Sequence, residues 1–252
     1  NGPVELQFAS GTYNSILLNQ NIPGTDSVNT VCFTSMAANA DSVIFVSYSG
    51  VGLTLNGVSN LIFKRITIDA VYGTYGVDFL NTCNNILFYK CNIKASPSGT
   101  SSNNVAVRYY QTSGVSTYLS NVRFIKNNIS GGYYNFYFYY PCGSNSYMSQ
   151  SSITIDSNIL TDAYNSGIYS YYYAYYPSIS YNTIKSRSNV SSTYYGIYTY
   201  YYTTVDTMQS NKIYITSTST AYGMRFYYHQ NRDVSYNARG PMFVANNEIN
   251  IQ

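Results

Sequence analysis

One short phrase recurs seven times between Leu61 and Ile249, each time with the same order of side chains. It consists of an apolar residue, a gap, a second apolar residue, and then Asn-x-Ile or a near substitute. The second apolar positions are Phe63, Phe88, Phe124, Ile155, Ile179, Met208 and Val244, which are 24 to 36 residues apart. A unit this short cannot bury its inner face alone, so successive units must stack as a solenoid.

The residues within each copy alternate between apolar and polar, which indicates strands rather than helices. The sequence therefore predicts an all-β fold, a right-handed parallel β-helix. The repeat is unbroken, so we expect one domain over residues 1–252, with N-terminal coils over 1–57 and regular coils over 58–252. The longer intervals should contain loops, and we expect these at Ser96–Asn103 and His229–Gly240, which are rich in turn-forming residues.

A second phrase lies between the copies of the first and places Gly or Asn directly before an alternating strand. Its copies begin at Tyr75, Asn103, Tyr134, Ser166, Tyr195 and Tyr222. We expect the Gly or Asn to form a tight corner with positive φ, and the following residues to alternate between inward and outward. Each coil should therefore contain at least two strands.

The Asn of the first phrase forms a column of candidate structural residues. Its members are Asn127, Asn158, Asn182, Asn211 and Asn247. Asn tolerates a left-handed corner, and amides stacked at the strand spacing of roughly 4.8 Å can hydrogen-bond along the stack. The column is therefore interpreted as a ladder, although simple turn residues would give the same pattern. Cys91 occupies the same position, which predicts an inward thiol.

Tyrosine is the compositional outlier, with 33 residues against 11 Phe and no Trp. Aligned by the second phrase, two sets of Tyr share outward columns. The first set is Tyr137, Tyr169 and Tyr198, and the second is Tyr139, Tyr171, Tyr200 and Tyr227. Two interpretations carry equal weight. The rings can simply shield the strands, or they can form an exposed stripe that binds glycans or a cell surface.

Charge and composition exclude several partners. Only 9% of residues are charged and the net charge is +3, so we expect no binding to nucleic acid. No apolar run is long enough to insert into a membrane. The four cysteines lack metal-binding spacing, and we favour buried free thiols over a disulfide. The chain begins at Asn1 and shows no capping pattern at either end, so we expect flanking domains or end-to-end self-association.

Three segments carry a resemblance to a known family. They are Val4–Tyr13, Leu18–Phe33 and Leu55–Lys64. They resemble the right-handed parallel β-helix repeats of large secreted surface proteins in Bacteroidota-type bacteria, which look like adhesins exported by the type IX route. The resemblance implies a pectate-lyase-like architecture and a secreted or cell-surface location. It also implies O-glycosylation in Asp-Ser/Thr-apolar patterns, which occur at Ser27, Ser42 and Thr207.

The alternative is a polysaccharide-processing enzyme, either a lyase or a glycoside hydrolase. Such enzymes need clustered carboxylates, but the ten acidic residues fall in different columns of the repeat. The best constellation is Asp69 with Asp78 and Arg108. The only histidine, His229, has no nucleophile motif beside it. We therefore predict no catalytic residues, no metal and no cofactor, and favour an extracellular structural or adhesive module.

Overall fold

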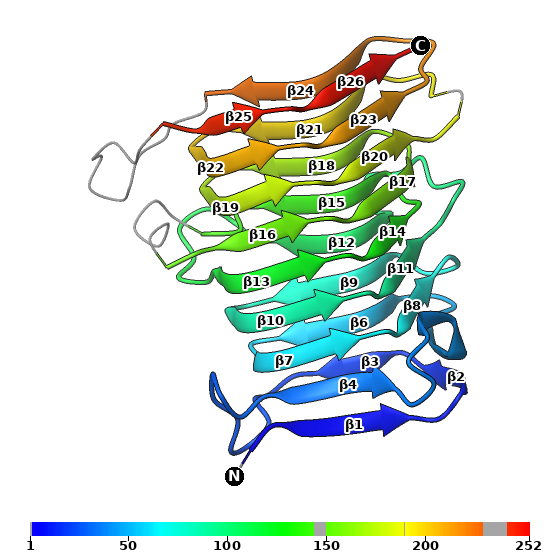
Figure 1. The fold of residues 1–252 in the computed structure, drawn as a ribbon, viewed down its shortest axis with the longest axis vertical. Coiled ribbons are helices and arrows are strands. Elements are labelled where there is room, and N and C mark those ends of the chain that lie inside the picture. The colour runs from blue at the N-terminus through cyan, green and yellow to red at the C-terminus, as the bar shows by residue number, and fades with distance from the viewer. Residues whose placement is uncertain (1, 144–149, 189, 229–240) are drawn as a thin grey trace.

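The computed structural model describes residues 2–143, 150–188, 190–228 and 241–252. This part of the chain forms three sheets, which we call sheets A, B and C, and their strands pair in parallel. Eight coils each contribute one strand to sheet A, one to sheet B and one to sheet C, and the last coil contributes only to sheets A and B. The coils stack along a single axis (Figure 1). The fold is the right-handed parallel β-helix that the repeat predicts.

Sheet A consists of β1 (Val4–Phe8), β4 (Val31–Ser35), β7 (Ser59–Lys64), β10 (Cys83–Tyr89), β13 (Leu119–Ile125), β16 (Ile153–Asp156), β19 (Ala174–Ser180), β22 (Thr203–Gln209) and β25 (Phe243–Ala245). Sheet B consists of β2 (Gly11–Asn14), β5 (Val43–Val46), β8 (Thr67–Ala70), β11 (Asn92–Ala95), β14 (Asn128–Ser130), β17 (Ile159–Ala163), β20 (Thr183–Ser186), β23 (Lys212–Ile215) and β26 (Glu248–Ile251).

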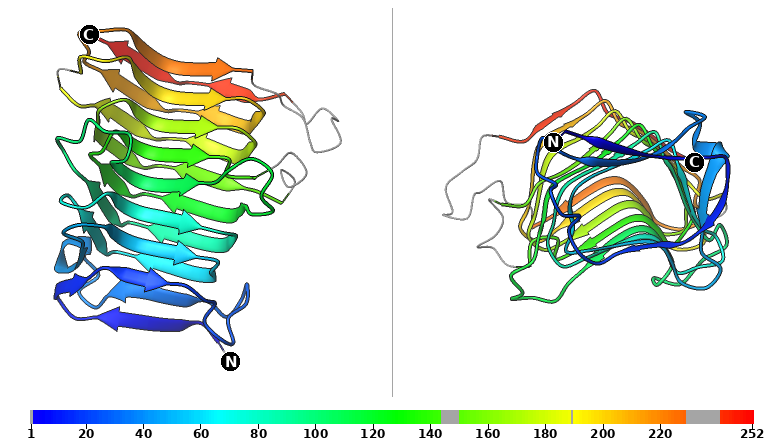
Figure 2. Two further views of the ribbon diagram at one scale, coloured as in Figure 1. Left: turned by 180° about the vertical axis from the view of Figure 1, so that it is seen from behind. Right: turned by 90° about the horizontal axis from the view of Figure 1, so that it is seen from below.

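Sheet C consists of β3 (Ile16–Leu18), β6 (Val51–Asn56), β9 (Tyr75–Leu80), β12 (Val105–Tyr110), β15 (Tyr134–Tyr139), β18 (Ser166–Tyr171), β21 (Tyr194–Tyr200) and β24 (Ala221–Tyr227). A short 3-10 helix, η1 (Ala40–Ser42), precedes β5. Seen along the stacking axis, the coils superpose, and the strands of sheet C are visibly arched (Figure 2). No helix in the described residues is long and apolar enough to cross a membrane.

Inward side chains stack on similar side chains of the neighbouring coils. In sheet A the rings of Phe33, Phe63, Phe88 and Phe124 are stacked with successive centroids 4.9 to 5.1 Å apart. The strand register places these four residues directly opposite one another. Burying a Phe side chain stabilises the fold by about 1.5–3 kcal/mol, so this column binds successive coils strongly.

The asparagine column is a ladder of buried amides at the corner between sheets A and B. Asn158 donates from Nδ2 to the carbonyl oxygen of Phe124 in the preceding coil at 2.8 Å and to Oδ1 of Asn182 in the next coil at 3.1 Å. Its Oδ1 accepts from the backbone N–H and the Nδ2 of Asn127, each at 2.9 Å. The amide of Asn158 thus has all four of its hydrogen-bonding positions occupied.

The same pattern extends along the stack. The Nδ2 atoms of Asn182 and Asn211 bind a carbonyl oxygen below and the next asparagine above. At the lower end, the backbone N–H of Cys91 donates to Oδ1 of Asn127 at 2.9 Å. The Cys91 thiol faces inward, 3.2 Å from the carbonyl oxygen of Phe63, and burial raises its pKa to about 12. Cys32 and Cys83 are also buried free thiols, and Cys142 is buried too.

The left-handed residue of each corner precedes the ladder position. Its occupants are Arg65, Lys90, Lys126, Ser157, Tyr181, Ser210 and Asn246, with φ between 54° and 60°. None of the ladder asparagines has a positive φ. The expectation that Asn itself forms the left-handed corner was therefore wrong. Its amide is held inward by its partners in the neighbouring coils, and the preceding residue makes the bend.

The glycines of the second phrase are required because a Cβ atom would not fit at these positions, and not because the backbone has a positive φ. Gly76, Gly167, Gly196 and Gly223 lie within strands of sheet C, and none has a positive φ. A Cβ atom on Gly196 would lie 2.4 Å from the carbonyl oxygen of Gly223 and 2.6 Å from Cγ2 of Ile213. The expected tight corner is therefore absent, and these glycines permit a close approach between sheet C and sheet B.

One copy of the second phrase was aligned two residues too early. Strand β12 pairs Val105 with Tyr75 and Val107 with Val77, so Ala106 occupies the position of Gly76. Asn104 precedes the strand and lies in the turn. The small side chain of Ala106 marks the position that Gly occupies elsewhere, which the search for Gly or Asn did not detect.

Several loops in the described residues depart from the regular coil, and residues 19–30 between β3 and β4 are one of them. The expected excursion at Ser96–Asn103 consists of turns between β11 and β12. Another excursion, over residues 111–118, connects β12 to β13 and was not anticipated. It is held by an antiparallel bridge between Tyr118 and Cys142. The excursion expected at His229–Gly240 lies outside the described residues.

Replacing a ladder amide should destabilise the fold. Asn158→Ala leaves the backbone N–H and Nδ2 of Asn127 without their buried acceptor, so we expect a loss of about 1–3 kcal/mol in the free energy of unfolding, measured by urea titration. The control is Asn128→Ala, which removes an exposed amide that donates to Oδ1 of Asn92. Equal losses for the two variants would contradict a structural role for the buried ladder.

The steric role of the sheet C glycines can be tested separately. A Cβ atom on Gly167 would lie 2.5 Å from Cγ2 of Ile184 and 2.8 Å from the carbonyl oxygen of Gly196. Gly167→Ala should therefore lower the free energy of unfolding by about 1–3 kcal/mol. Gly50→Ala serves as the control, because its nearest neighbour would be Oγ of Ser47 at 3.9 Å. A Gly167 variant as stable as the Gly50 variant would refute the steric explanation.

Candidate functional site

The outer side of sheet C carries two columns of aromatic and basic side chains, which together we call the tyrosine face. The inner column is Arg108, Tyr137, Tyr169, Tyr198 and Arg225. The outer column is Tyr110, Tyr139, Tyr171, Tyr200 and Tyr227. Each residue pairs directly with its neighbour in the column through the strand register. The seven tyrosines identified from the sequence thus lie together on one side of the molecule.

Rings of the outer column stack face to face. Successive centroids from Tyr110 to Tyr227 are 4.8, 5.2, 4.4 and 4.9 Å apart, and the interplanar angles lie between 2° and 12°. Each internal ring therefore covers its neighbours' faces and presents its edge and hydroxyl to solvent. The end rings, Tyr110 and Tyr227, are the most exposed, at 40% and 39%.

The inner column is packed more deeply than the sequence suggested. Tyr198 is only 8% exposed, so its ring is not part of an exposed stripe. The guanidinium of Arg225 lies 5.4 Å from its ring centroid, and the ring of Tyr195 stacks on it at 4.7 Å. Burial raises the pKa of Tyr198 to about 12, although Arg225 opposes this shift. The expected exposure of Tyr198 was therefore wrong.

A third column of tyrosines, which the sequence analysis did not resolve, follows the corner between sheets C and A. Its members are Tyr140, Tyr172, Tyr201 and Tyr228, with φ between 45° and 60°. Their rings stack at 4.5, 5.2 and 4.6 Å. A left-handed backbone is unusual for a bulky residue, and the ring stacking offsets this strain. The Tyr-Tyr doublets at the ends of β15, β18, β21 and β24 were the available signal.

A pocket of about 370 Å³ lies at the lower end of the tyrosine face. It is lined by Tyr75, Ser102, Asn103, Arg108, Tyr110 and Tyr137. The guanidinium of Arg108 lies 4.2 Å from the ring centroid of Tyr75 and 5.3 Å from that of Tyr110. The pocket therefore combines flat aromatic walls with one positive charge and several hydroxyl and amide groups.

Arg108 also contacts the buried carboxyl group of Asp78. Its Nε atom lies 3.7 Å from Asp78 Oδ1, and only 8% of the Asp78 side chain is exposed. Burial raises the pKa of Asp78 to about 6, although the charge of Arg108 acts in the opposite direction. The carboxyl group thus keeps its proton to a higher pH than an ordinary Asp.

The proposed constellation of Asp69, Asp78 and Arg108 does not form. Asp69 lies on β8 in sheet B, where its Oδ2 is 3.9 Å from Nζ of Lys94. Asp78 and Arg108 lie opposite each other in sheet C. Residues close in sequence are thus separated by the turn from one sheet to the next. No group of three or more potential metal ligands is present among the described residues.

The three sites predicted for O-glycosylation differ in their surroundings. Ser27 is exposed in a loop where Asp26 accepts the backbone N–H groups of Val28 and Asn29. Ser42 is half-buried at the end of η1, and Thr207 is half-buried within β22. Ser27 is the most accessible of the three hydroxyls.

Comparison with protein-family models, curated proteins and solved structures returned no match.

The raised pKa of Asp78 predicts a pH-dependent stability. In the folded state the Asp78 carboxyl group keeps its proton up to about pH 6, whereas in the unfolded state its pKa has the ordinary value of 3.8. The protonated carboxyl group therefore stabilises the folded state at low pH, and this contribution is lost as the pH rises from the unfolded pKa through the folded pKa. Two pKa units correspond to about 3 kcal/mol in the free energy of unfolding. Asp78→Asn should remove this contribution in urea titrations between pH 4 and 7. Parallel pH profiles for the variant and the native chain would contradict it.

Proposed function

We propose that this chain is a structural and adhesive module of a secreted or cell-surface protein, and that the tyrosine face binds carbohydrate. The observation that carries the proposal is the register of the columns, which brings Tyr side chains from successive coils onto one face with Arg108 and Arg225. The sequence resemblance to bacterial surface proteins supports the location. Contact with flanking domains or with other copies of the chain belongs to the same proposal.

The chemistry of the face suits sugars. Tyrosine phenols are protonated at neutral pH, so those of the tyrosine face can donate hydrogen bonds to sugar hydroxyls. Stacked rings lose little conformational freedom on binding, which favours affinity. The stacking also limits where a sugar can lie flat on a ring, since the internal ring faces are covered.

The pocket beside Arg108 and Tyr110 is therefore the proposed primary subsite. Tyr110 is the lower end of the outer column and is 40% exposed, so Tyr139 stacks on only one face of its ring, and the guanidinium of Arg108 lies 5.3 Å from the ring centroid. A sugar ring can stack its C–H groups on this aromatic surface while Arg108, Ser102 and Asn103 bind its hydroxyls. Tyr227 offers a second aromatic surface at the opposite end of the column.

A glycan array followed by calorimetry on the glycans that bind tests this function. Tyr110→Ser with Tyr227→Ser should weaken binding roughly tenfold or more, because each removes an aromatic anchor, while the melting temperature changes little. The matched control is Tyr48→Ser with Tyr72→Ser, which removes an exposed ring pair 6.4 Å apart outside the tyrosine face. Absence of any glycan binding, or an equal loss in the control, would refute the proposal.

A polysaccharide-processing enzyme is the second candidate, and one observation favours it. The pKa of Asp78 lies at about 6, a value suited to a general acid. Hydrolysis by the usual mechanism requires two carboxyl groups, however, and no carboxyl group lines the pocket in the described residues. Release of reducing ends from a polysaccharide by the native chain, and its loss in Asp78→Asn, would favour the enzyme over the binding module.

A further inference from the structure

The corner between sheets A and B carries cationic side chains on three successive coils. Arg65, Lys90 and Lys126 all occupy the left-handed position before the ladder, with φ of 54°, 54° and 58°. The backbone N–H of Arg65 donates to the carbonyl oxygen of Tyr89, and that of Lys90 donates to the carbonyl oxygen of Ile125. The three residues are therefore in register, at the coil spacing of roughly 4.8 Å. We call them the cation column.

Corner geometry does not explain this choice of residues. In the later coils the same position is occupied by Ser157, Tyr181, Ser210 and Asn246, which form the same bend without a charge. A left-handed backbone favours Gly or Asn over Lys or Arg. The cation column is thus a feature of this region and not a requirement of the fold.

A polar pocket of about 500 Å³ adjoins the cation column on the outer side of sheet B. Three lysines contribute to its lining, namely Lys90, Lys94 and Lys126, together with the side chains of Asn92 and Asn128. Ser130, Asn39, Ala40 and the acidic residue Asp41 complete the walls. The pocket therefore offers three ammonium groups, amides and a hydroxyl group against one carboxylate, that of Asp41.

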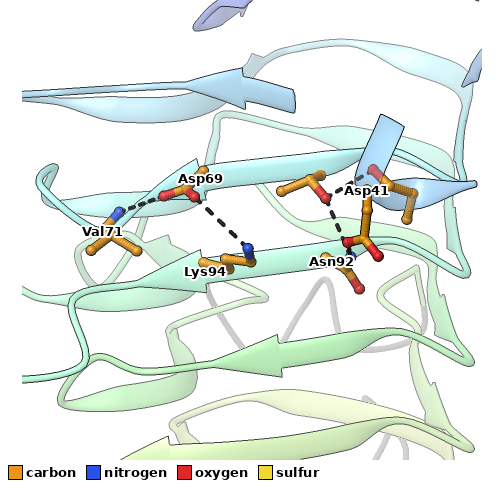
Figure 3. Close-up of polar contacts among 7 residues, drawn as sticks. Asp41, Asp69, Val71, Asn92 and Lys94 are labelled. Carbon is orange, nitrogen blue, oxygen red and sulfur yellow. Dashed lines mark hydrogen bonds and ion pairs between the residues drawn. The ribbon is translucent and has the colours of Figure 1, made fainter. Parts of the chain in front are cut away.

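Internal contacts engage the nearby carboxylates and leave two lysines available. Asp69 Oδ2 lies 3.9 Å from Nζ of Lys94, and Asp41 Oδ1 accepts a hydrogen bond from Nδ2 of Asn92 at 2.8 Å (Figure 3). Lys90 and Lys126 are exposed, and neither forms an ion pair with any described residue, although Nζ of Lys90 lies 5.3 Å from the ring centroid of Tyr89. Their charges are therefore free to meet an external anion.

We propose that this corner binds an acidic polysaccharide, whose carboxylate or sulfate groups contact Lys90, Lys126 and Arg65. A single exposed ion pair is weak and screened by salt, so one small anion would not be held tightly. A linear polymer that lies along the stacking axis carries repeated anionic groups, and these can contact the cationic side chains of successive coils at the same time. The several weak contacts then add up to a higher overall affinity. The amides of Asn92 and Asn128 and the hydroxyl of Ser130 suit sugar hydroxyls. Aromatic rings, which would stack nucleobases, do not line the pocket.

This site is independent of the tyrosine face, because it lies on the corner between sheets A and B whereas the tyrosine face lies on sheet C. Substitutions at one site should leave the other unaffected. Failure of the acidic-polysaccharide site therefore says nothing about the proposed function, and the reverse also holds.

The test compares binding of polygalacturonate, dextran sulfate, neutral dextran and single-stranded poly(dT) to the full chain by calorimetry at low and physiological salt. The variant is Lys90→Asn with Lys126→Asn, since Asn246 already occupies the same corner position. We expect at least one acidic polysaccharide to bind, with a salt-sensitive affinity that falls roughly fivefold to thirtyfold in the variant. Binding of polygalacturonate identifies carboxylates as the ligand, and binding of dextran sulfate identifies sulfates.

The control removes the same charge elsewhere through Lys185→Gln with Lys212→Gln, both exposed on sheet B. It should retain native affinity, as should Tyr110→Ser. The proposal is overturned if neither acidic polysaccharide binds, if the control loses as much affinity as the corner variant, or if poly(dT) or neutral dextran binds as tightly as the acidic polysaccharides.

Discussion

The buried amide ladder is the interaction on which the rest of the structure depends. Each internal asparagine binds a carbonyl group in the coil below and an asparagine in the coil above, as Asn182 does with Ile155 and Asn211. A shift of one residue would reverse inward and outward side chains and leave these buried amides without partners, which is costly. The ladder therefore fixes the register between coils, although the ladder positions are 24 to 36 residues apart in sequence.

Both candidate surfaces are consequences of that register. Once the ladder aligns the coils, residues at equal offsets from it form columns, and the length differences are absorbed in loops such as Ser96–Asn103. The tyrosine face arises this way on sheet C, and the cation column arises one residue before the ladder itself. Ring stacking in the tyrosine columns then reinforces the alignment, with centroids as close as 4.4 Å between Tyr171 and Tyr200.

The fold and the columns could be predicted from the sequence because they depend on spacing alone. The constant distance between Asn158 and Leu160, repeated in other coils, is enough to indicate the ladder. Exposure could not be predicted, since the burial of Tyr198 depends on Arg225 and Tyr195 in three dimensions. The role of Gly196 was misjudged because a sequence shows the residue but neither its φ nor the carbonyl group beside it. The cation column was detectable, as Arg65, Lys90 and Lys126 all precede a ladder position.

Native-state hydrogen exchange tests the central claim most directly, namely that the ladder holds the register of the stack. The backbone N–H groups of Asn127, Asn158 and Asn182 donate to ladder amides at 2.9 to 3.0 Å. The account predicts that these amides exchange only through global unfolding, whereas amides in the loop Ser96–Asn103 exchange through local opening. Exchange of the ladder amides as fast as that of the loop would contradict it.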